Sequence, residues 1–457
     1  MNFPVLCRLQ VFVGVVAVLG LAGCGGPGGP AVPEGISPAP GAQTYSPAPS
    51  LRWKPVEGAA DYWVQVARNA DFTEGVVNDR TPIARYVAPR GLEPGTYYWR
   101  VAAVDGAGPG AFSAAASFSI LAHQRIFTIP PEADLAAMRQ VVADAAAQAP
   151  AKVVFAPGAE YRIAPEAFAF SLRDVSDLEL DGNGATLIIT QPTAAFLELS
   201  RCGRITVRNF TIDFDPVPFA VGTVRAVDEK AGTFTVAADP GMSEFDAPHL
   251  LKHWSMGVTL DSTTPGRMKT GSFLVVDTDQ SRSVRTEAGF VIALKNPQVA
   301  ASFAPGDKYV QFARSNGGRS LVVTDHCPEA AFIGITTYAI SAGHYVLHYS
   351  DDAKVLGCRE LIRPGRWFGG NADGVHVRSS WMGPWIEGCT IEGIGDDGIA
   401  IYGKGIRILE KPSETSLRLD GEFFTLKPGT EFLVFDPNTG YPIAEKLTVR
   451  SVTEVAR

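Results

Sequence analysis

The sequence has no run of basic residues, and its overall charge is negative. Its 457 residues include 40 Lys and Arg against 48 Asp and Glu, which gives a net charge of -8. Proteins that bind nucleic acids need clustered Lys and Arg to contact phosphates. We therefore expect no nucleic-acid partner. A hydrophobic content of 46% with 19% charged residues excludes a disordered chain and allows a large core.

Long hydrophobic runs are also missing, apart from one near the N-terminus. Arg8 precedes an apolar stretch over 11–20, and Leu-Ala-Gly-Cys follows at 21–24. This order is typical of a secretory signal, and the apolar run is too short to span a bilayer. The last four residues resemble the lipobox of bacterial lipoproteins. The resemblance implies a signal peptide over 1–23, lipidation of Cys24, and a lipid-anchored protein of the bacterial cell envelope, at the outer membrane, the cell surface or the periplasm.

Cysteine is scarce beyond that signal. The four remaining cysteines are spread too widely to form a dense disulfide framework: Cys202, Cys327, Cys358 and Cys389. The last two each follow a glycine in similar segments. We interpret them as small buried hydrophobic residues on successive turns of a repeat.

Helical periodicity is confined to one segment. Residues 131–148 carry apolar residues at i, i+3 and i+4 spacing, which predicts an amphipathic helix. No such period follows, and this excludes a doubly wound sheet, whose parallel strands need crossover helices. Gly and Pro make up 80 of the 457 residues, against a usual combined share of about 12%. This composition favours a turn-rich β protein.

What the chain does have is a series of three-to-five-residue strands bounded by Gly, Asn or Asp. They recur at intervals of roughly 20–30 residues, which indicates a solenoid of stacked turns. The predicted helix leads into Val-Val-Phe-x-Pro-Gly-x-x-Tyr at 153–161. This entry resembles that of pectate-lyase-type proteins, and it implies a right-handed parallel β-helix over 123–457.

Two shorter parts precede the predicted coil. Residues 24–45 are rich in Gly and Pro and predict a flexible tether. Residues 46–122 show short alternating strands with aromatic residues, which predicts a β-sandwich with an aromatic core. Trp53 and the string Leu-Glu-Pro-Gly-Thr-Tyr-Tyr-Trp-Arg-Val at 92–101 resemble a fibronectin type III domain.

Two stretches interrupt the coil, at about 217–320 and 405–457. Their Pro-Gly segments align apolar on apolar at three positions: Phe303 with Leu426, Tyr309 with Phe432, and Phe312 with Phe435. We interpret both as related antiparallel β modules inserted into an otherwise all-β coil. Since the chain stops at Arg457 inside the second module, we expect the coil to be C-terminally incomplete.

The residues best suited to chemistry lie between 369 and 405. Asp373 precedes Asp396 and Asp397 by 23 and 24 residues, about one turn of such a coil. Neighbouring turns lie about 4.8 Å apart, so the three carboxylates should be close together. Crowded carboxylates cannot all stay ionised, and we expect at least one pKa to rise. The cluster would then hold the acid and the base that glycosidic cleavage requires.

Two other interpretations of these aspartates stay open. Asn-x-Asp-Gly and Gly-Asp-Asp-Gly also occur as turn sequences at the corners of coils. Clustered carboxylates also bind calcium. No His/Cys cluster has zinc spacing, and we expect neither a metal nor another cofactor.

Two known families share this pattern. Asn-x-Asp-Gly followed one turn later by Asp-Asp is similar to the polygalacturonases of glycoside hydrolase family 28. Ala372-Asp373, His376, Asp396-Asp397 and Ile-Ala-Ile-Tyr-Gly at 399–403 resemble more closely family 110, the exo-acting α-1,3-galactosidases. Both families invert the anomeric carbon. The resemblance implies that the three aspartates share the acid and base roles, with Asp396 as the acid.

The residues expected to contact the sugar flank these aspartates: Asn371, His376, Arg366, Trp367, Tyr402 and Lys404. Where family 110 usually has Asn and His, this chain has Ala400 and Tyr402, so the sugar contacts should differ. The sequence predicts a hydrolase acting on an α-linked galactoside or related glycan within a poly- or oligosaccharide. The alternatives are a polygalacturonase-like pectin hydrolase, a lyase with Lys404 or Arg378 as base, and a non-catalytic glycan-binding lipoprotein.

Overall fold

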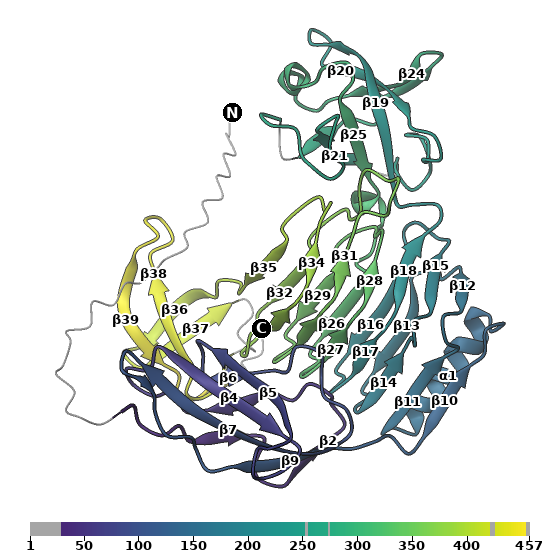
Figure 1. The fold of residues 1–457 in the computed structure, drawn as a ribbon. Coiled ribbons are helices and arrows are strands. Elements are labelled where there is room, and N and C mark those ends of the chain that lie inside the picture. Colours follow the sequence, from purple (N-terminus) through teal and green to yellow (C-terminus); the bar gives the residue numbers. More distant parts are fainter. Residues whose placement is uncertain (1–28, 252–254, 273–274, 421–425, 454–457) are drawn as a thin grey trace.

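The computed structural model describes residues 29–251, 255–272, 275–420 and 426–453. Figure 1 shows a sandwich in purple, a coil of parallel strands in blue to green, a module projecting from the coil, and C-terminal hairpins in yellow. The predicted signal peptide and Cys24 lie outside the described residues. Within these residues, no helix has the length and apolar character needed to cross a membrane.

The coil consists of three parallel sheets, to which successive turns contribute strands in the same order. The first sheet contains β10 (Ile126–Ile129), β11 (Ala151–Phe155), β14 (Leu178–Asp181), β17 (Thr206–Arg208), β27 (Ala331–Ile333), β30 (Lys354–Leu356) and β33 (Trp385–Glu387). The second contains β12 (Glu160–Ile163), β15 (Thr186–Ile189), β18 (Thr211–Phe214), β28 (Thr336–Thr337), β31 (Arg359–Glu360) and β34 (Thr390–Ile391). The third contains β13 (Phe168–Arg173), β16 (Ala195–Ser200), β26 (Val322–Asp325), β29 (Tyr345–His348), β32 (Val375–Arg378) and β35 (Ile399–Tyr402). The predicted parallel β-helix is confirmed.

Apolar side chains fill the inside of the coil. Phe155 lies against Phe210 and Phe170, with ring centroids 5.0 and 6.3 Å apart, and Phe196 packs on Phe210 at 5.3 Å. All four rings are buried. Burying such a side chain stabilises the fold by about 1.5–3 kcal/mol, so this ladder of rings holds the first turns together.

Residues with positive φ form the corners. Between the first and second sheets, equivalent positions on five turns have φ between 51 and 64°: Asn183, Asn209, Gly334, Gly357 and Gly388. A left-handed residue turns the chain sharply, and Gly and Asn adopt this conformation at the lowest cost. This requirement explains why the predicted strands are bounded by Gly, Asn or Asp.

Helix α1 (Leu135–Ala147) covers the N-terminal end of the coil (Figure 1). Met138, Val142 and Ala145 are its buried residues, in agreement with the predicted apolar face. The helix begins later than predicted because Asp134 caps it, accepting a hydrogen bond from the Ala137 N–H at 2.8 Å.

Two sheets form the sandwich. One contains β1 (Gly35–Ser37), β3 (Leu51–Trp53) and β6 (Arg85–Tyr86); the other contains β2 (Ala42–Thr44), β9 (Ala116–Ile120), β7 (Gly95–Asp105), β4 (Asp61–Ala67) and β5 (Gly75–Thr81), with β8 (Gly108–Pro109) beside β7. The aromatic core is confirmed, since Trp53, Trp99 and Phe118 are buried. The predicted tether over 24–45 is wrong for β1 and β2, because these strands pair with β3 and β9. Neither strand buries a residue, so no hydrophobic pattern marked them.

The sandwich packs directly on the first sheet of the coil. Arg85 forms an ion pair with Asp352, whose carboxylate also accepts a hydrogen bond from Ser50 at 2.7 Å. The ammonium of Lys354, with no exposed surface, lies 3.1 Å from the same carboxylate. Tyr86 also contacts the ring of Trp385, with centroids 6.1 Å apart. The two parts are therefore joined by a buried charged contact as well as an apolar one.

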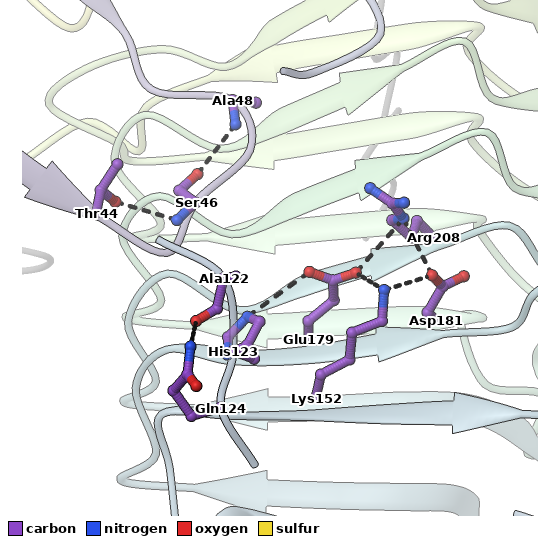
Figure 2. A network of polar contacts seen from close by, with 10 residues as sticks. All are labelled: Thr44, Ser46, Ala48, Ala122, His123, Gln124, Lys152, Glu179, Asp181 and Arg208. Carbon is purple, nitrogen blue, oxygen red and sulfur yellow. Dashed lines mark hydrogen bonds and ion pairs between the residues drawn. The ribbon is translucent and has the colours of Figure 1, made fainter. Parts of the chain in front are cut away.

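A second polar network lies where the linker after the sandwich crosses the first sheet. Figure 2 shows Lys152 between Glu179 and Asp181, at 2.8 Å from each carboxylate. Arg208 lies 3.5 and 3.4 Å from the same two groups. His123 of the linker is 3.7 Å from Glu179. Four charged side chains on neighbouring turns thus neutralise one another under the linker.

The first inserted module is a single antiparallel sheet with its own core. In spatial order its strands are β22 (Val276–Thr278), β21 (Ser255–Leu260), β25 (Lys308–Phe312), β19 (Phe219–Asp228), β20 (Thr233–Ala238), β24 (Gly289–Ala293) and β23 (Val284–Thr286). Two 3₁₀ helices accompany them, η1 (Pro297–Ser302) and η2 (Arg314–Asn316). The base of the module connects β18 to β26, so its last residues return to the coil at the third sheet.

The second module differs from the first. Its described residues form two hairpins, β36 (Arg407–Ser413) with β37 (Ser416–Asp420), and β38 (Glu431–Phe435) with β39 (Pro442–Thr448). The predicted alignment does place strand on strand, since Tyr309 lies in β25 and Phe432 in β38. Phe312 is fully buried whereas Phe435, its aligned residue, is half exposed. The expected likeness therefore holds for one strand and not for the sheet.

Candidate active site

Asp373 and Asp397 occupy equivalent positions on neighbouring turns, immediately before β32 and β35. The two strands pair with Val375 opposite Ile399, and the Gly374 N–H donates to the carbonyl of Asp397 at 3.0 Å. A separation of 24 residues is therefore one turn. Asp396 precedes Asp397, so the three aspartates lie where β32 and β35 begin, at the N-terminal ends of strands of the third sheet.

His376 connects Asp373 to Tyr402. The imidazole donates through Nδ1 to the carboxylate of Asp373, because an ionised carboxylate can only accept. Its Nε2 lies 3.1 Å from the hydroxyl of Tyr402, which donates to this nitrogen when the imidazole is neutral. Tyr402, half exposed on β35, thereby helps to fix the ring that holds Asp373.

The environment of Asp373 keeps it ionised. Burial by itself raises the pKa of this carboxyl group, but the hydrogen bond and charge of His376, together with the charge of Arg314, lower it below its usual 3.8. The expected rise in pKa from crowding is therefore wrong for Asp373. The reason is that a histidine and an arginine, and not only carboxylates, surround it.

Arg314 reaches the site from the inserted module. It belongs to η2, directly after β25, and its guanidinium forms an ion pair with Asp396. The Asp397 N–H also donates to the Asp396 carboxylate at 3.2 Å. An ion pair stabilises the charged form of a carboxyl group. Arg314 was not among the predicted site residues.

The predicted sugar contacts are distributed over four places. His376 and Tyr402 lie beside Asp373, Arg366 and Trp367 line a separate pocket, Asn371 lies in the core, and Lys404 is exposed after β35. The prediction for Asn371 is contradicted, because its side chain has no exposed surface. Its amide donates to the carbonyls of Pro218 and Ser341 at 2.8 and 3.2 Å. This residue holds the base of the inserted module against the coil.

The separate pocket has a volume of about 280 Å³ and lies between the inserted module and the loop before Phe368. Arg366 donates to Asp213, a buried residue of β18, at 2.5 and 3.0 Å. Lys308 of β25 lies 5.0 Å from the ring centroid of Trp367 and pairs with Asp239 at 2.7 Å. The pocket therefore presents an aromatic face beside two cations, each held by its own carboxylate.

A buried histidine lies directly behind the turn that carries Asp373. The backbone N–H of His344 donates to the carbonyl of Asp373 at 2.9 Å. The imidazole Nδ1 of His344 lies 3.2 Å from the carboxyl group of Glu360. Burial lowers the pKa of His344 to about 3 and raises the pKa of Glu360 well above its usual value. Burial thus favours the neutral imidazole and the protonated carboxyl group, out of contact with water.

No three His, Cys, Asp or Glu side chains in the described part of the chain are placed to share a metal ion. The carboxylates of Asp373 and Asp396 point instead to His376 and Arg314.

No protein-family model and no curated protein matches the sequence. Among solved structures, the chain is similar to the family 28 exopolygalacturonase of Yersinia enterocolitica, with 13% identity and a TM-score of 0.39. That likeness covers 81% of this chain and 65% of the exopolygalacturonase. The chain is also similar to the sixth fibronectin type III domain of human fibronectin type III domain containing protein 3, at 18% identity and a TM-score of 0.17 over 22% of this chain and 94% of that one. The assignment of the coil itself rests on its strand pairing.

Proposed function

We propose that this protein is a glycoside hydrolase that cleaves an α-linked galactoside or a related galacturonide with inversion at the anomeric carbon. The observation that carries the proposal is the register that places Asp397 one turn beyond Asp373, with Asp396 beside it. Inverting cleavage needs one carboxyl group to protonate the leaving oxygen and another to activate water on the opposite face of the sugar. Aspartates at the ends of strands on neighbouring turns supply both the acid and the base.

Asp373 is the base in this mechanism. Its lowered pKa keeps it ionised at neutral pH, and the hydrogen bond from His376 fixes its orientation. Asp373 accepts a proton from the attacking water while the acid gives its proton to the departing glycosidic oxygen. Tyr402 acts on Asp373 through His376 and is a positioning residue.

Asp396 is the acid, as the family resemblance implies, and its carboxylate forms an ion pair with Arg314 of the inserted module. Asp397, exposed on the same turn, is the alternative acid.

The pocket at Trp367 distinguishes the two classes of substrate. An aromatic face stacks on a sugar ring, and a galacturonide also carries a carboxylate for which Arg366 and Lys308 are cationic partners. A galactoside has no such group. A higher rate on the galacturonide than on the galactoside would therefore indicate that Arg366 and Lys308 contact the substrate.

A screen of nitrophenyl α-glycosides and of pectic and host glycans tests the proposal. We expect the release of nitrophenol and reducing ends, and its loss in Asp373→Asn but not in the matched variant Asp325→Asn, on the same sheet two turns away. An unsaturated uronide whose formation stops on adding a chelator would assign the site to a lyase. Glycan binding without any cleavage would make the protein a carbohydrate-binding lipoprotein.

The proposed location is the bacterial cell envelope, with a lipid anchor at Cys24. Leu-Ala-Gly-Cys at 21–24 supports this proposal. Each buried CH₂ of an acyl chain contributes about 0.8 kcal/mol to membrane binding, and two chains anchor a protein stably. Such an anchor would present the coil to extracellular or periplasmic glycans.

A further inference from the structure

Cys202 and Cys327 lie on neighbouring turns at the corner between the third and first sheets. Ser200 of β16 is opposite Asp325 of β26, and each cysteine follows two residues later. The Cys202 N–H donates to the Cys327 sulfur at 3.3 Å. Neighbouring turns are spaced at about 4.8 Å, which lies inside the Cα–Cα range of roughly 4.4–6.8 Å that disulfides require.

We propose that Cys202 and Cys327 form a disulfide when the chain folds in an oxidising compartment. Both are free thiols in this structure. Each donates to the carbonyl two residues before it, Cys202 to Ser200 at 3.4 Å and Cys327 to Asp325 at 3.3 Å. A rotation of the two side chains toward each other replaces these weak hydrogen bonds by a covalent bond between turns. The link closes a loop that contains the entire inserted module, and with it Arg314.

The reaction proceeds by two thiol–disulfide exchanges with a disulfide oxidant, such as glutathione disulfide or a protein dithiol oxidase. The Cys202 thiolate attacks one sulfur of the oxidant and releases the other as a thiolate. The Cys327 thiolate then attacks the Cys202 sulfur of the mixed disulfide and releases the second thiolate. Two electrons pass to the oxidant, and the two thiol protons end on its two sulfurs.

Contact between the two sulfurs favours Cys202 as the nucleophile of the first exchange. The contact with Cys327, together with hydrogen bonds to the backbone, outweighs burial and lowers the pKa of Cys202 to about 6. The same contact and burial raise the pKa of Cys327. Thiolates, and not thiols, attack disulfides, so Cys202 is the sulfur that reacts first as the corner closes and the two residues meet.

Burial sets the time of the reaction. Cys202 is 1% exposed and Cys327 is not exposed, so an oxidant reaches them only while this corner is open, during folding. Once the corner has closed, the same burial protects the bond from reductants.

Cys358 and Cys389 provide the matched control within the chain. They also lie on neighbouring turns, next to Arg359 and Thr390, which pair across β31 and β34. Like the first pair, each thiol contacts the carbonyl two residues before it, but Cys358 also donates to Phe332 at 3.4 Å and Cys389 to Val355 at 3.3 Å. Burial raises the pKa of Cys358 to about 12. We expect these two to stay thiols, as the buried hydrophobic residues that the sequence predicted.

The test uses the full chain isolated from an oxidising compartment and unfolded in the presence of maleimide without reductant. Peptide mass spectrometry should find Cys358 and Cys389 labelled, and Cys202 and Cys327 unlabelled and linked in one peptide pair until a reductant is added. Labelling of Cys202 and Cys327 before reduction, or a link to Cys358 or Cys389, would overturn the proposal.

Thermal unfolding gives a second measurement. The wild type, reduced in denaturant and refolded with reductant present, should unfold about 5 °C below the oxidised wild type, because the bond closes a loop of more than 100 residues. Cys327→Ser should unfold at the same temperature with and without reductant, whereas Cys358→Ser should keep the difference. Serine fits this corner, since Ser350 occupies the equivalent position on the next turn. A wild type that does not respond to reductant would also contradict the proposal.

Discussion

Arg314 forms an ion pair with Asp396, although the two residues are 82 positions apart in the chain. Arg314 ends the inserted module, and Asp396 lies on the turn before β35. The module is therefore part of the candidate active site and not an appendage of the coil. Because the charge of Arg314 also lowers the pKa of Asp373, one guanidinium acts on two of the three aspartates.

Replacing Arg314 by Gln should shift the pH dependence of activity. Because the charge of Arg314 lowers the pKa of Asp373, its loss should raise that pKa, and the acidic limb of the pH–rate profile, below which the base is protonated, should move to higher pH. Arg285→Gln, which removes an exposed arginine paired with Asp246 in the same module, is the control and should leave the profile unchanged. An Arg314→Gln limb that stays in place would contradict the assignment of Asp373 as the base.

The neutral forms of His344 and Glu360 that burial favours predict how stability depends on pH. Their usual pKa values are 6.5 and 4.5. Between these values the unfolded pair holds one proton, as the folded pair does, so stability should be constant. Above pH 6.5 the unfolded pair loses its proton and stability falls as pH rises. Below pH 4.5 it takes up a second proton and stability falls as pH drops, in each case by at most about 1.4 kcal/mol per pH unit.

Glu360→Gln tests this account, because glutamine does not titrate. The variant should lose less stability than the wild type when urea unfolding is repeated from pH 6.5 to 8.5. Glu198→Gln, at an exposed position of β16, should follow the wild type. Parallel curves for the wild type and Glu360→Gln would show that the pair binds no extra proton in the folded state.

Asp352→Asn should weaken the contact between sandwich and coil. The change leaves the ammonium of Lys354 buried without its nearest carboxylate and removes the partner of Arg85. Breaking a buried pair in this way costs about 3 kcal/mol, which urea unfolding can measure. Asp174→Asn removes an exposed pair with Arg201 at another corner and should change stability little. Equal effects of the two substitutions would contradict the account.

Cys24→Ser tests the proposed lipid anchor. Lipidation needs the sulfur of Cys24, so the wild type should partition into the detergent phase and the variant into the aqueous phase. Cys7→Ser, which changes a cysteine inside the predicted signal, should behave as the wild type. Identical partitioning of the wild type and Cys24→Ser would exclude the anchor.

The repeat of the coil could be predicted from sequence because the same local pattern recurs in the sequence of each turn. Short apolar strands end in residues that tolerate positive φ, and the distance of 24 residues between Asp373 and Asp397 is one turn. In a solenoid each turn contacts only its neighbours. The spacing of residues along the sequence therefore predicts which residues lie next to one another in the structure. This is why the equivalent positions of Asp373 and Asp397 on neighbouring turns can be predicted from sequence.

The partners of these aspartates could not be predicted in the same way. Arg314 approaches Asp396 across an antiparallel module, and Arg366 pairs with Asp213 from a position 153 residues away. No local spacing encodes such contacts. The predicted rise in the pKa of Asp373 is wrong for the same reason, because it considers the carboxylates alone and not His376 and Arg314, which the fold brings to them.

The rates of Asp373→Asn, Asp396→Asn and Asp397→Asn, compared with Asp325→Asn on a substrate that the wild type cleaves, test the central claim most directly. Each change removes a proton donor or acceptor with almost no change in volume. General acid–base catalysis contributes about 10²–10⁴-fold, so Asp373→Asn and Asp396→Asn should lose activity on that scale while Asp325→Asn stays near the wild-type rate. If both variants keep more than about a tenth of the wild-type rate, the aspartates are turn residues and the site is not the one that cleaves the glycosidic bond.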